Sequence, residues 1–294
     1  MIIVKLTGGL GNQLFQYAFA RSLARKHKVR LKLDIYSYES VDRNLTPREY
    51  ELGQFNIQAE LAKPREVWHL RNESRIGNFV SAIGARLFPF GLRRVKEEHF
   101  HFSPKMLRLP DNVYLDGYWQ SERYFRDDAG LIRDELQFRT TMPGAEDRHV
   151  EKQIQQGTAI AVHVRRGDFV SSKNIYAIHG VCGLDYYREA IAYAADHIRN
   201  GKLFVFSDDP TWVKDNLKTG LPTSYVTHNS AKTAIQDFRL MTLCQHQIIA
   251  NSTFSWWAAW LNANPTKIVI APSRWFATDE FDTGDLLPEQ WVRL

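Results

Sequence analysis

The sequence has 294 residues, 44% of them apolar, which is enough for two compact domains or one large one. A formal net charge of +5 and a pI near 9.1 weakly favour an anionic partner, namely nucleic acid, an anionic membrane or a phosphorylated substrate. Two cysteines 62 positions apart suggest neither a disulfide scaffold nor a zinc site, and no apolar run reaches the roughly 20 residues that span a bilayer. We therefore expect a globular, cytoplasmic protein with at most peripheral contact at the inner face of a membrane.

The first segment of the chain has the pattern of a nucleotide-binding half-domain. Residues 2–6 predict a buried strand, residues 14–23 have apolar side chains at helical spacing, and residues 29–34 predict the next strand. The loop between the first strand and the helix is Gly9-Leu-Gly-Asn-Gln-Leu14. Because leucine stands where the dinucleotide fingerprint requires its third glycine, a nicotinamide dehydrogenase is disfavoured.

The start of the helix after this loop is still a good place for a phosphate or a sugar, because free backbone N–H groups point outward there. Gly9 and Gly11 belong to the loop, and Asn12 and Gln13 add amides that can bond sugar hydroxyls. A plain helix N-cap at Asn12 explains that residue equally well.

A basic stretch follows. Residues 62–108 look helical and contain ten Lys and Arg against four Glu. A solvated face explains this composition most simply. The alternative is a surface that meets anionic lipid or an acidic glycan carrier.

Residues 113–116 predict a strand that leads into Gly117-Tyr-Trp-Gln120. Aromatic rings stack on the apolar face of a pyranose while amides hold its hydroxyls, so Tyr118, Trp119 and Gln120 are candidates for a sugar platform. Two aromatic residues of a core would give the same pattern.

The second half of the chain alternates strands with helices, which predicts parallel pairing and a three-layer α/β domain. Strands are expected at 160–164, 203–206, 248–250 and 267–271, and helices at 231–247 and 254–261. Residues 139–144 are the best linker candidate. We therefore expect one domain at 1–143 and a second at 144–294.

Three of these strands end in polar clusters, which should converge on one rim because ligands bind outside the carboxyl ends of parallel strands. The clusters are His163-Val-Arg-Arg-Gly-Asp168, Ser207-Asp-Asp209 and Asn251-Ser-Thr-Phe-Ser255. Two guanidiniums suit an anion, and the hydroxyls and N–H groups of a helix start would complete a diphosphate clamp. Taken singly, a surface arginine pair and an ordinary N-cap remain alternatives.

Asp208 and Asp209 raise the question of a metal. Metal-dependent sugar transferases typically place two carboxylates two residues apart, and no Asp in this chain has another Asp at that spacing. Adjacent carboxylates at a strand end usually face opposite ways, so this pair is better interpreted as hydrogen-bonding or helix-capping. We expect no metal, and an arginine to neutralise the leaving diphosphate instead.

Five motifs in order along nearly the whole chain resemble the bacterial α-1,2-fucosyltransferases of glycosyltransferase family 11. They are Gly8–Tyr17, Gly117–Glu122, His163–Asp168, Phe206–Asp209 and Asn251–Trp257. The resemblance implies a GT-B-like fold, with two Rossmann-like domains that face a central cleft and GDP-fucose in the second. It also implies an inverting, metal-independent transfer of L-fucose from GDP-β-L-fucose to the 2-hydroxyl of a terminal β-galactoside of an oligosaccharide or lipid-linked, O-antigen-type glycan, without a cofactor.

The same resemblance implies roles for individual residues. Arg165 holds the diphosphate, His163 lies beside the guanine, Asp237 reads the guanine N–H edge and Asn12 faces the fucose. Asp168 is the nearest candidate for a general base, although some related enzymes manage without a dedicated one. The other donor-site candidates are Gly9, Gly11, Gln13, Asp208, Asp209, Asn251, Ser252, Thr253, Phe254 and Ser255, and the acceptor-site candidates are Tyr118, Trp119 and Gln120.

Three alternatives from other classes stay open at this point. A dehydrogenase would bind NADH tightly, and a nucleic-acid-binding protein would bind RNA or DNA with a steep salt dependence. A non-catalytic sugar-binding module would bind fucosylated glycan and leave GDP-fucose unchanged. We expect an enzyme, with no nucleic acid among its partners.

Overall fold

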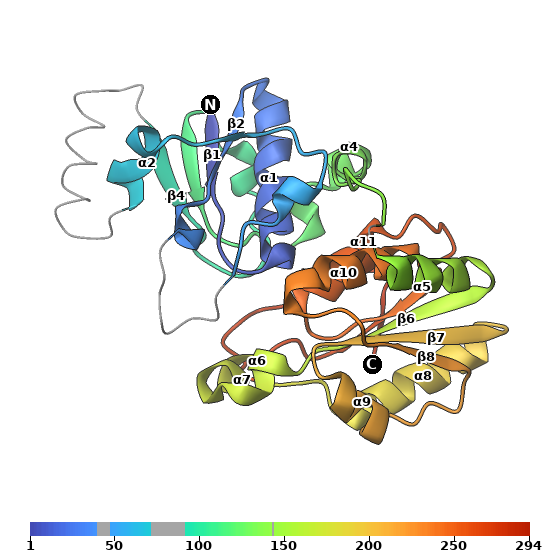
Figure 1. Cartoon of the computed structure of the whole chain (residues 1–294). Coiled ribbons are helices and arrows are strands. Elements are labelled where there is room, and N and C mark those ends of the chain that lie inside the picture. Colours follow the sequence, from blue (N-terminus) through green and yellow to red (C-terminus); the bar gives the residue numbers. More distant parts are fainter. Residues whose placement is uncertain (40–47, 72–91, 143) are drawn as a thin grey trace. The chain divides into compact units, whose positions relative to one another are not determined.

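The computed structural model describes residues 1–39, 48–71, 92–142 and 144–294 (Figure 1). The chain divides into two compact units. Unit 1 consists of Met1–Arg139 and Asp282–Leu286, and unit 2 of Thr140–Phe281 and Leu287–Leu294. The division after Arg139 lies four residues before the boundary expected at 143, and the expected second domain includes a short segment that belongs to unit 1.

Asp285 holds this returning segment in unit 1. Its carboxylate pairs with Arg123 and accepts a hydrogen bond from the N–H of Phe102 at 3.3 Å, while its carbonyl accepts one from the buried Ser121 hydroxyl at 2.9 Å. The last two partners lie 183 and 164 positions earlier in the chain. No local sequence signal marks a contact over such a separation, so a contiguous second domain was the natural expectation.

Unit 1 is built on a five-stranded parallel sheet with the order β3-β2-β1-β5-β4. The strands are β1 (Ile2–Lys5), β2 (Leu31–Asp34), β3 (Glu60–Leu61), β4 (Arg93–Lys96) and β5 (Val113–Asp116). Its helices are α1 (Leu10–His27), α2 (Pro64–Arg71) and α4 (Ala129–Glu135), with 3-10 turns η1 (Tyr36–Tyr38), η2 (Leu52–Gln54), η3 (Met106–Arg108), η4 (Glu122–Tyr124) and η5 (Arg126–Asp128).

Helices cover both sides of this sheet (Figure 1). On one side, α1 is buried along most of its length and ends where Lys28 takes a left-handed conformation, φ 55°. On the other side, Val67 and Leu70 of α2 pack against Ile3 of the central strand β1 and Tyr114 of its neighbour β5. A parallel sheet covered in this way needs strands that are apolar on both faces, and the sequence of β1 meets that need.

Unit 2 contains a six-stranded parallel sheet with the order β11-β10-β9-β6-β7-β8. The strands are β6 (Thr158–Val164), β7 (Gly201–Ser207), β8 (Thr223–Val226), β9 (His246–Ile248), β10 (Val269–Ala271) and β11 (Val292–Arg293). Its helices are α5 (Ala145–Gln155), α6 (Gly167–Ser171), α7 (Lys173–His179), α8 (Leu184–His197), α9 (Pro210–Asn216), α10 (Ala234–Leu243) and α11 (Thr253–Leu261), and η6 (Ala231–Thr233) precedes α10.

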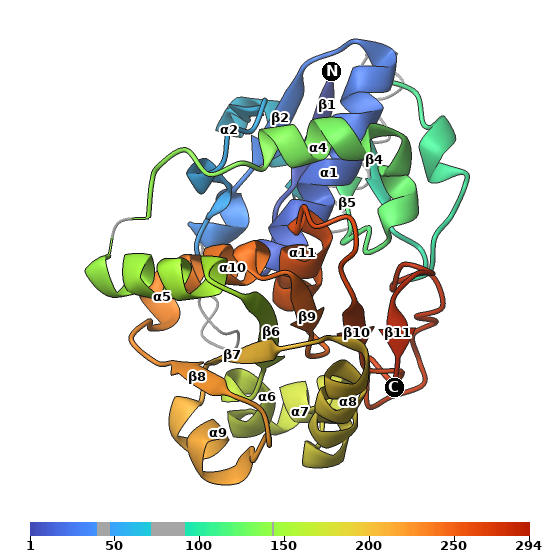
Figure 2. The ribbon, with the colours of Figure 1, turned by 90° about the vertical axis from the view of Figure 1, so that its right-hand side faces the viewer.

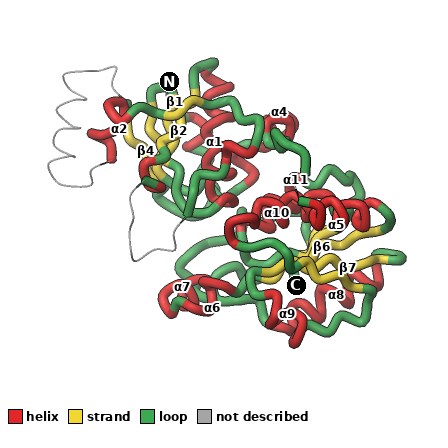
Figure 3. The backbone as a smooth tube through the Cα atoms, in the orientation of Figure 1, coloured by secondary structure: helices red, strands yellow, loops and turns green. Residues whose placement is uncertain are grey.

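The sheet of unit 2 lies between two helical layers. Helices α5, α10 and α11 lie on one side, and α8 and α9 on the other (Figures 1, 2 and 3). Ile160, Val162 and Val164 of the central strand β6 enter one core cluster with Tyr187 and Ala190 of α8. The predicted α/β architecture of two parallel-sheet units is therefore confirmed.

Two sequence predictions about elements are wrong. Within the stretch expected to be helical, Arg93–Lys96 forms the edge strand β4, where only Val95 is buried, so its charged residues hid the strand signal. The helix expected at 231–247 ends at Leu243, because His246–Ile248 pairs with β6 and β10. The buried amide of Gln247 donates to the Met241 carbonyl at 2.9 Å, which lets a polar residue occupy a central strand.

Within the described residues, no helix combines the length and apolar character needed to cross a membrane. The basic segment 62–108 contains α2, β4 and η3, and its residues 72–91 lie outside the described part of the chain. Membrane contact through this segment stays a prediction.

Candidate functional site

The carboxyl ends of β9, β6 and β7 lie side by side at one rim of the sheet in unit 2. In the parallel register Val162 pairs with Ile248 of β9, and Val164 pairs with Ser207 of β7. The three polar clusters that follow these strands therefore begin at the same level, and the predicted convergence is confirmed.

Arg165 is held by two carboxylates at this rim. Its Nη1 lies 2.6 Å from Asp208 Oδ2, and its Nη2 donates to Asp168 Oδ1. The guanidinium also lies over the ring of Phe169, 5.3 Å from the ring centroid. These contacts fix the plane of the guanidinium, so its remaining N–H groups have a defined direction.

Arg166 is directed to different partners. Its guanidinium carbon lies 3.6 Å from the ring centroid of Trp212, and its Nε donates to Asp209 Oδ2 at 3.1 Å. The other oxygen of Asp209 accepts the N–H of Trp212 at 3.2 Å and caps α9. The interpretation of the Asp208–Asp209 pair as hydrogen-bonding and capping residues is therefore confirmed.

Asp208 also fixes the backbone after β6. Its Oδ1 accepts the N–H of Arg166 at 2.8 Å. A Cβ on Gly167 would lie 2.5 Å from Asp208 Oδ2, so a larger residue here would have to displace that carboxylate. With Asp168 and Asp209, three carboxylates stand beside two guanidiniums. An anionic ligand here must share Arg165 with carboxylates that already bind it. No group of three or more acidic, histidine or cysteine side chains in the described ranges is arranged to hold a metal ion.

His163, the first residue of this motif, is buried with a free ring nitrogen. Its side chain lies 5.6 Å from the ring of Phe254, which in turn lies 5.2 Å from that of Phe238. Burial, and secondly the charge of Arg165, lower the pKa of His163 to about 3, so the imidazole is neutral. Its Nδ1 has no hydrogen-bond partner among the described residues. Since buried polar groups are nearly always bonded, this nitrogen is a candidate contact for a ligand.

Asn251 and Ser255 were predicted to help bind an anion, and the structure gives them internal partners instead. The buried amide of Asn251 donates to the carbonyls of His179 at 2.8 Å and Trp275 at 3.1 Å, and its oxygen lies 3.4 Å from Cys182 Sγ. The buried hydroxyl of Ser255 donates to backbone carbonyls, one of them that of Ser252 at 3.3 Å. These two side chains hold the start of α11 in place and have no free group for a phosphate.

Ser252 and Thr253 remain at the start of α11. Ser252 is the N-cap residue, with an extended backbone and no capping hydrogen bond from its side chain. Both residues are partly exposed, as is Phe254. The first N–H groups of this nine-residue helix thus point toward the rim that carries Arg165.

Asp237 lies on α10, the helix between β8 and β9. Burial raises its pKa to about 6, while a hydrogen bond from Asn229 Nδ2 at 2.8 Å opposes the rise. Its second oxygen, Oδ2, has no hydrogen-bond partner in the described ranges. Nearby, His228 Nε2 and Asn229 Nδ2 lie 2.8 Å and 3.0 Å from Asp147 Oδ1. An open depression of about 460 Å³ adjoins this cluster, lined by Ala145, Glu146, His149, Val150, Tyr225, Val226, Thr227 and His228.

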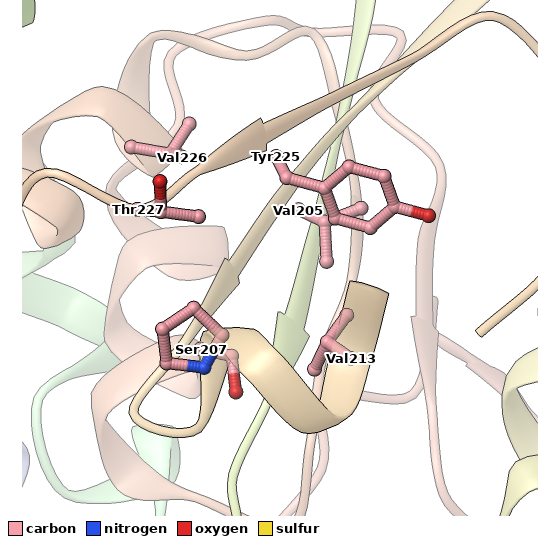
Figure 4. Close-up of a pocket in the computed structure, with 7 residues that line it drawn as sticks. Val205, Ser207, Val213, Tyr225, Val226 and Thr227 are labelled. Carbon is pink, nitrogen blue, oxygen red and sulfur yellow. The ribbon is translucent and has the colours of Figure 1, made fainter. Parts of the chain in front are cut away.

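A second depression, between β7, β8 and α9, has no room for a water molecule (Figure 4). Val205 and Val213 face one another across it, and the Tyr225 hydroxyl donates to the Leu217 carbonyl at 3.0 Å. It belongs to the packing beneath α9 and offers no space to a ligand.

In unit 1 the predicted residues gather after β1 and β5. The N-cap of α1 is Gly9, and Asn12 is the third residue of the helix, so the N-cap alternative for Asn12 is wrong. Asn12 Oδ1 instead accepts from Gln120 Nε2 at 3.0 Å, and Gly11 is buried in the first turn. Gln13 is fully buried, and its amide contacts the Gly8 and Glu49 carbonyls and the Glu51 N–H. Gln13 therefore holds a neighbouring loop, and the structure corrects its assignment to a ligand.

The turn after β5 separates its two aromatic residues. Trp119, at φ 57°, is fully buried against Phe19 and Tyr124, so its ring offers no face to a sugar and that expectation is corrected. Tyr118 is 41% exposed and remains available. The carboxylate of Glu97 accepts the N–H groups of Tyr118 at 2.6 Å and Trp119 at 2.9 Å and fixes this turn.

Sequence reasoning missed Glu97, Asp147, Asn229 and Trp212. Trp212 stands three residues after Asp209, the spacing at which an N-cap side chain bonds a backbone N–H. This pattern places the Trp212 ring close to the strand end that carries Arg166, so the sequence held a signal for it. Asp147 meets Asn229 across 82 positions and Glu97 meets Tyr118 across 21, whereas Asn229 meets Asp237 across 8. No local pattern signals them.

The model of glycosyl transferase family 11 matches residues 92–294. An O-antigen biosynthesis glycosyltransferase of Escherichia coli, WbnK, is 34% identical over 302 residues, which cover 98% of this chain and 99% of the relative. An alpha-1,2-colitosyltransferase of Escherichia coli is 32% identical over 298 residues, covering 100% of this chain and 99% of the relative. The solved structure of a variant of Arabidopsis thaliana FUT1 in complex with GDP has a TM-score of 0.51 at 12% identity, covering 91% of this chain and 69% of that one, and it is similar in fold.

Proposed function

Because the chain belongs to glycosyl transferase family 11 and is a glycosyltransferase, we propose that it transfers L-fucose from GDP-β-L-fucose to the 2-hydroxyl of a terminal β-galactoside. The reaction inverts the anomeric carbon and needs no metal or cofactor. The acceptor is a galactose-terminated oligosaccharide or lipid-linked glycan of the O-antigen type, and the similarity to an O-antigen biosynthesis glycosyltransferase of Escherichia coli supports the O-antigen type.

One observation carries this proposal more than any other. His163 is buried with an unpartnered Nδ1 two residues before Arg165, whose guanidinium is held in a fixed plane. A nucleotide diphosphate has both groups that such a pair would contact, a flat base with hydrogen-bonding nitrogens and an anionic diphosphate. The start of α11 adds backbone N–H groups at the same rim.

In the proposed reaction, the bond between the fucose anomeric carbon and the β-phosphate oxygen breaks as the galactose 2-oxygen attacks from the opposite face. Negative charge gathers on the β-phosphate, so a guanidinium placed there binds the transition state more strongly than the ground state. We assign that role to Arg165. The acceptor proton passes to Asp168, whose carboxylate must then loosen its contact with Arg165, or it passes to water while Asp168 orients the acceptor.

The remaining assignments are proposals of the same kind. Asp237 would accept from the guanine N–H edge through Oδ2, and Asn12 would face the fucose with Gly9 nearby. On the acceptor side, exposed Tyr118 would stack on a sugar ring while Gln120 contributes its buried Oε1, which has no partner among the described residues. Action at the inner face of a membrane through segment 62–108 belongs to this proposal too.

A second donor is favoured by a specific finding, the full-length similarity to an alpha-1,2-colitosyltransferase. Colitose is L-fucose without its 3-hydroxyl. A site that hydrogen-bonds that hydroxyl rejects the deoxy sugar by about 10⁴-fold or more, whereas a site that only surrounds it discriminates about 10²-fold or less. The choice between the two donors thus depends on whether the site hydrogen-bonds the 3-hydroxyl of the sugar.

The test is incubation of the protein with GDP-fucose or GDP-colitose and a panel of β-galactosides, with the product linkage determined by NMR. We expect an α-1,2-fucosylated galactoside and a kcat/KM ratio in favour of GDP-fucose. Preference for GDP-colitose would establish the second donor, and GDP release without a glycosylated product on any β-galactoside would refute the acceptor class. Asp168→Asn should lower kcat strongly, and near-normal turnover would remove its role as a base.

A further inference from the structure

The side-chain amide of Asn229 lies between two carboxylates. Its Nδ2 is 2.8 Å from Asp237 Oδ1 and 3.0 Å from Asp147 Oδ1, so its two N–H groups can donate one hydrogen bond to each. The reverse orientation would set the amide oxygen against two carboxylate oxygens, so hydrogen bonding selects the orientation observed. Asn229 thereby links α10, which carries Asp237, to α5, which carries Asp147.

We propose that Asn229 is a positioning residue of the donor site, which keeps Asp237 ionised and turned so that Oδ2 accepts the N–H groups of a guanine-type base. This inference rests on the proposed GDP-sugar donor. Its geometric basis is that the two oxygens of Asp237 differ in their hydrogen bonding. Oδ1 is bound by Asn229, and Oδ2 has no partner among the described residues.

The charges around Asp237 pull in opposite directions. Burial raises its pKa to about 6, and the hydrogen bond from Asn229 is the largest influence that lowers it. The charge of His228, after β8, also lowers the pKa, and the negative charge of Asp147 on α5 raises it. Helix α11, which packs on α10, contains no charged residue, and the one basic residue of η6, Lys232, is exposed. Asn229 and Asp147 therefore act on the same carboxylate with opposite sign.

Because Asn229 and Asp147 shift the pKa of Asp237 in opposite directions, substituting them should move the pH dependence of GDP binding in opposite directions. A merely structural role of Asn229 would not produce this pattern. An ionised carboxylate accepts the N–H groups of the base more strongly than a protonated carboxyl does, so GDP binding is strong above the pKa of Asp237 and weakens below it. Asn229→Ala removes a hydrogen bond to the charged form and should raise the midpoint by about one pH unit. Asp147→Asn removes a like charge, keeps an Oδ1 acceptor, and should lower the midpoint by a similar amount.

The experiment is isothermal titration of the full chain with GDP from pH 5 to pH 8. With a midpoint near 6 for the unmodified protein, Asn229→Ala should weaken binding about fivefold at pH 6 and hardly at all at pH 8. Asp147→Asn should tighten binding about fivefold at pH 5. Asn264→Ala is the matched control, because that amide also makes an internal hydrogen bond, to the Gln245 carbonyl at 3.0 Å, but lies at the amino end of β9. It should leave the pH profile unchanged.

Unchanged midpoints in both variants, or midpoints that move in the same direction, would overturn the inference while GDP still binds the unmodified protein. If the unmodified protein does not bind GDP at any pH, the donor proposal is refuted, and this inference with it. Thermal unfolding of each variant, without ligand, separates a loss of folding from a loss of binding. Should Asn229→Ala fail to fold, the downward shift in Asp147→Asn still decides the matter, and its absence would overturn the inference.

Discussion

Replacement of Arg165 by lysine tests the proposed stabilisation of the leaving diphosphate most directly. Lysine keeps the positive charge but not the planar fork, which in the structure spans Asp208 at 2.6 Å on one side and Asp168 on the other, above the ring of Phe169. An ammonium can approach one of these carboxylates closely, so its direction toward a phosphate is no longer fixed. We therefore expect the turnover of the lysine variant to lie between that of the alanine variant and that of the unmodified protein.

The magnitude follows from the loss of a transition-state donor, which costs on the order of 10² to 10³ in turnover, or about 2.7 to 4 kcal/mol. Arg165→Ala should show that loss in full, and Arg165→Lys should recover part of it, leaving kcat roughly 10- to 100-fold low. The assay is initial-rate kinetics at saturating acceptor with varied GDP-fucose. Arg188→Lys is the matched control, since Arg188 pairs with Asp185 at 2.9 Å on the exposed face of α8 and the substitution should be neutral. Near-normal kcat in Arg165→Lys would refute the argument.

Three further predictions concern the metal, the acceptor turn and its glycine. Activity should survive EDTA, and loss on chelation with recovery on adding magnesium or manganese would contradict the arginine argument. Trp119→Ala should lower the free energy of unfolding by about 3–5 kcal/mol, measured by urea denaturation, because its ring is fully buried. Tyr118→Ala should leave stability almost unchanged and raise the KM for the acceptor, and an unchanged KM would remove Tyr118 from the acceptor site. Gly117→Ala should destabilise the protein, because the new Cβ would lie 2.4 Å from the Cβ of Glu97, whereas Gly130→Ala, at the second position of α4 with nothing within 4 Å of the new Cβ, should stabilise it by at most about 0.5 kcal/mol. Equal effects of the two glycine substitutions would show that the approach of Glu97 does not matter.

The positions of the polar clusters at the rim of unit 2 could be predicted from the sequence because each follows an apolar strand directly. His163 to Asp168 is such a case, since parallel strands place their carboxyl ends together. The role of each side chain within a cluster could not be predicted the same way. Asn251 and Ser255 share a motif with Ser252 and Thr253, yet the first two turn inward to backbone carbonyls.

The acceptor turn shows the same limit. Tyr118 and Trp119 are neighbours in one motif, and the sequence left a sugar platform and a core pair equally open. The positive φ of Trp119, held by two N–H groups that donate to Glu97, sends one ring into the core and leaves the other exposed. That conformation depends on a residue 21 positions earlier than Tyr118.

By itself, the sequence determined the α/β class, the parallel sheets, the order of the motifs and the family resemblance, because hydrophobic periodicity, strand ends and glycine loops are local properties. Only the tertiary structure decided which polar side chains are used internally and which remain available. It showed that the Gln13 amide bonds to backbone groups and that His163 Nδ1 has no partner among the described residues. It also showed that Asn229 donates to both Asp237 and Asp147. The physical reason is that a hydrogen bond depends on distance and direction between atoms, which residues far apart in the chain acquire only when the sheet and its helices are packed.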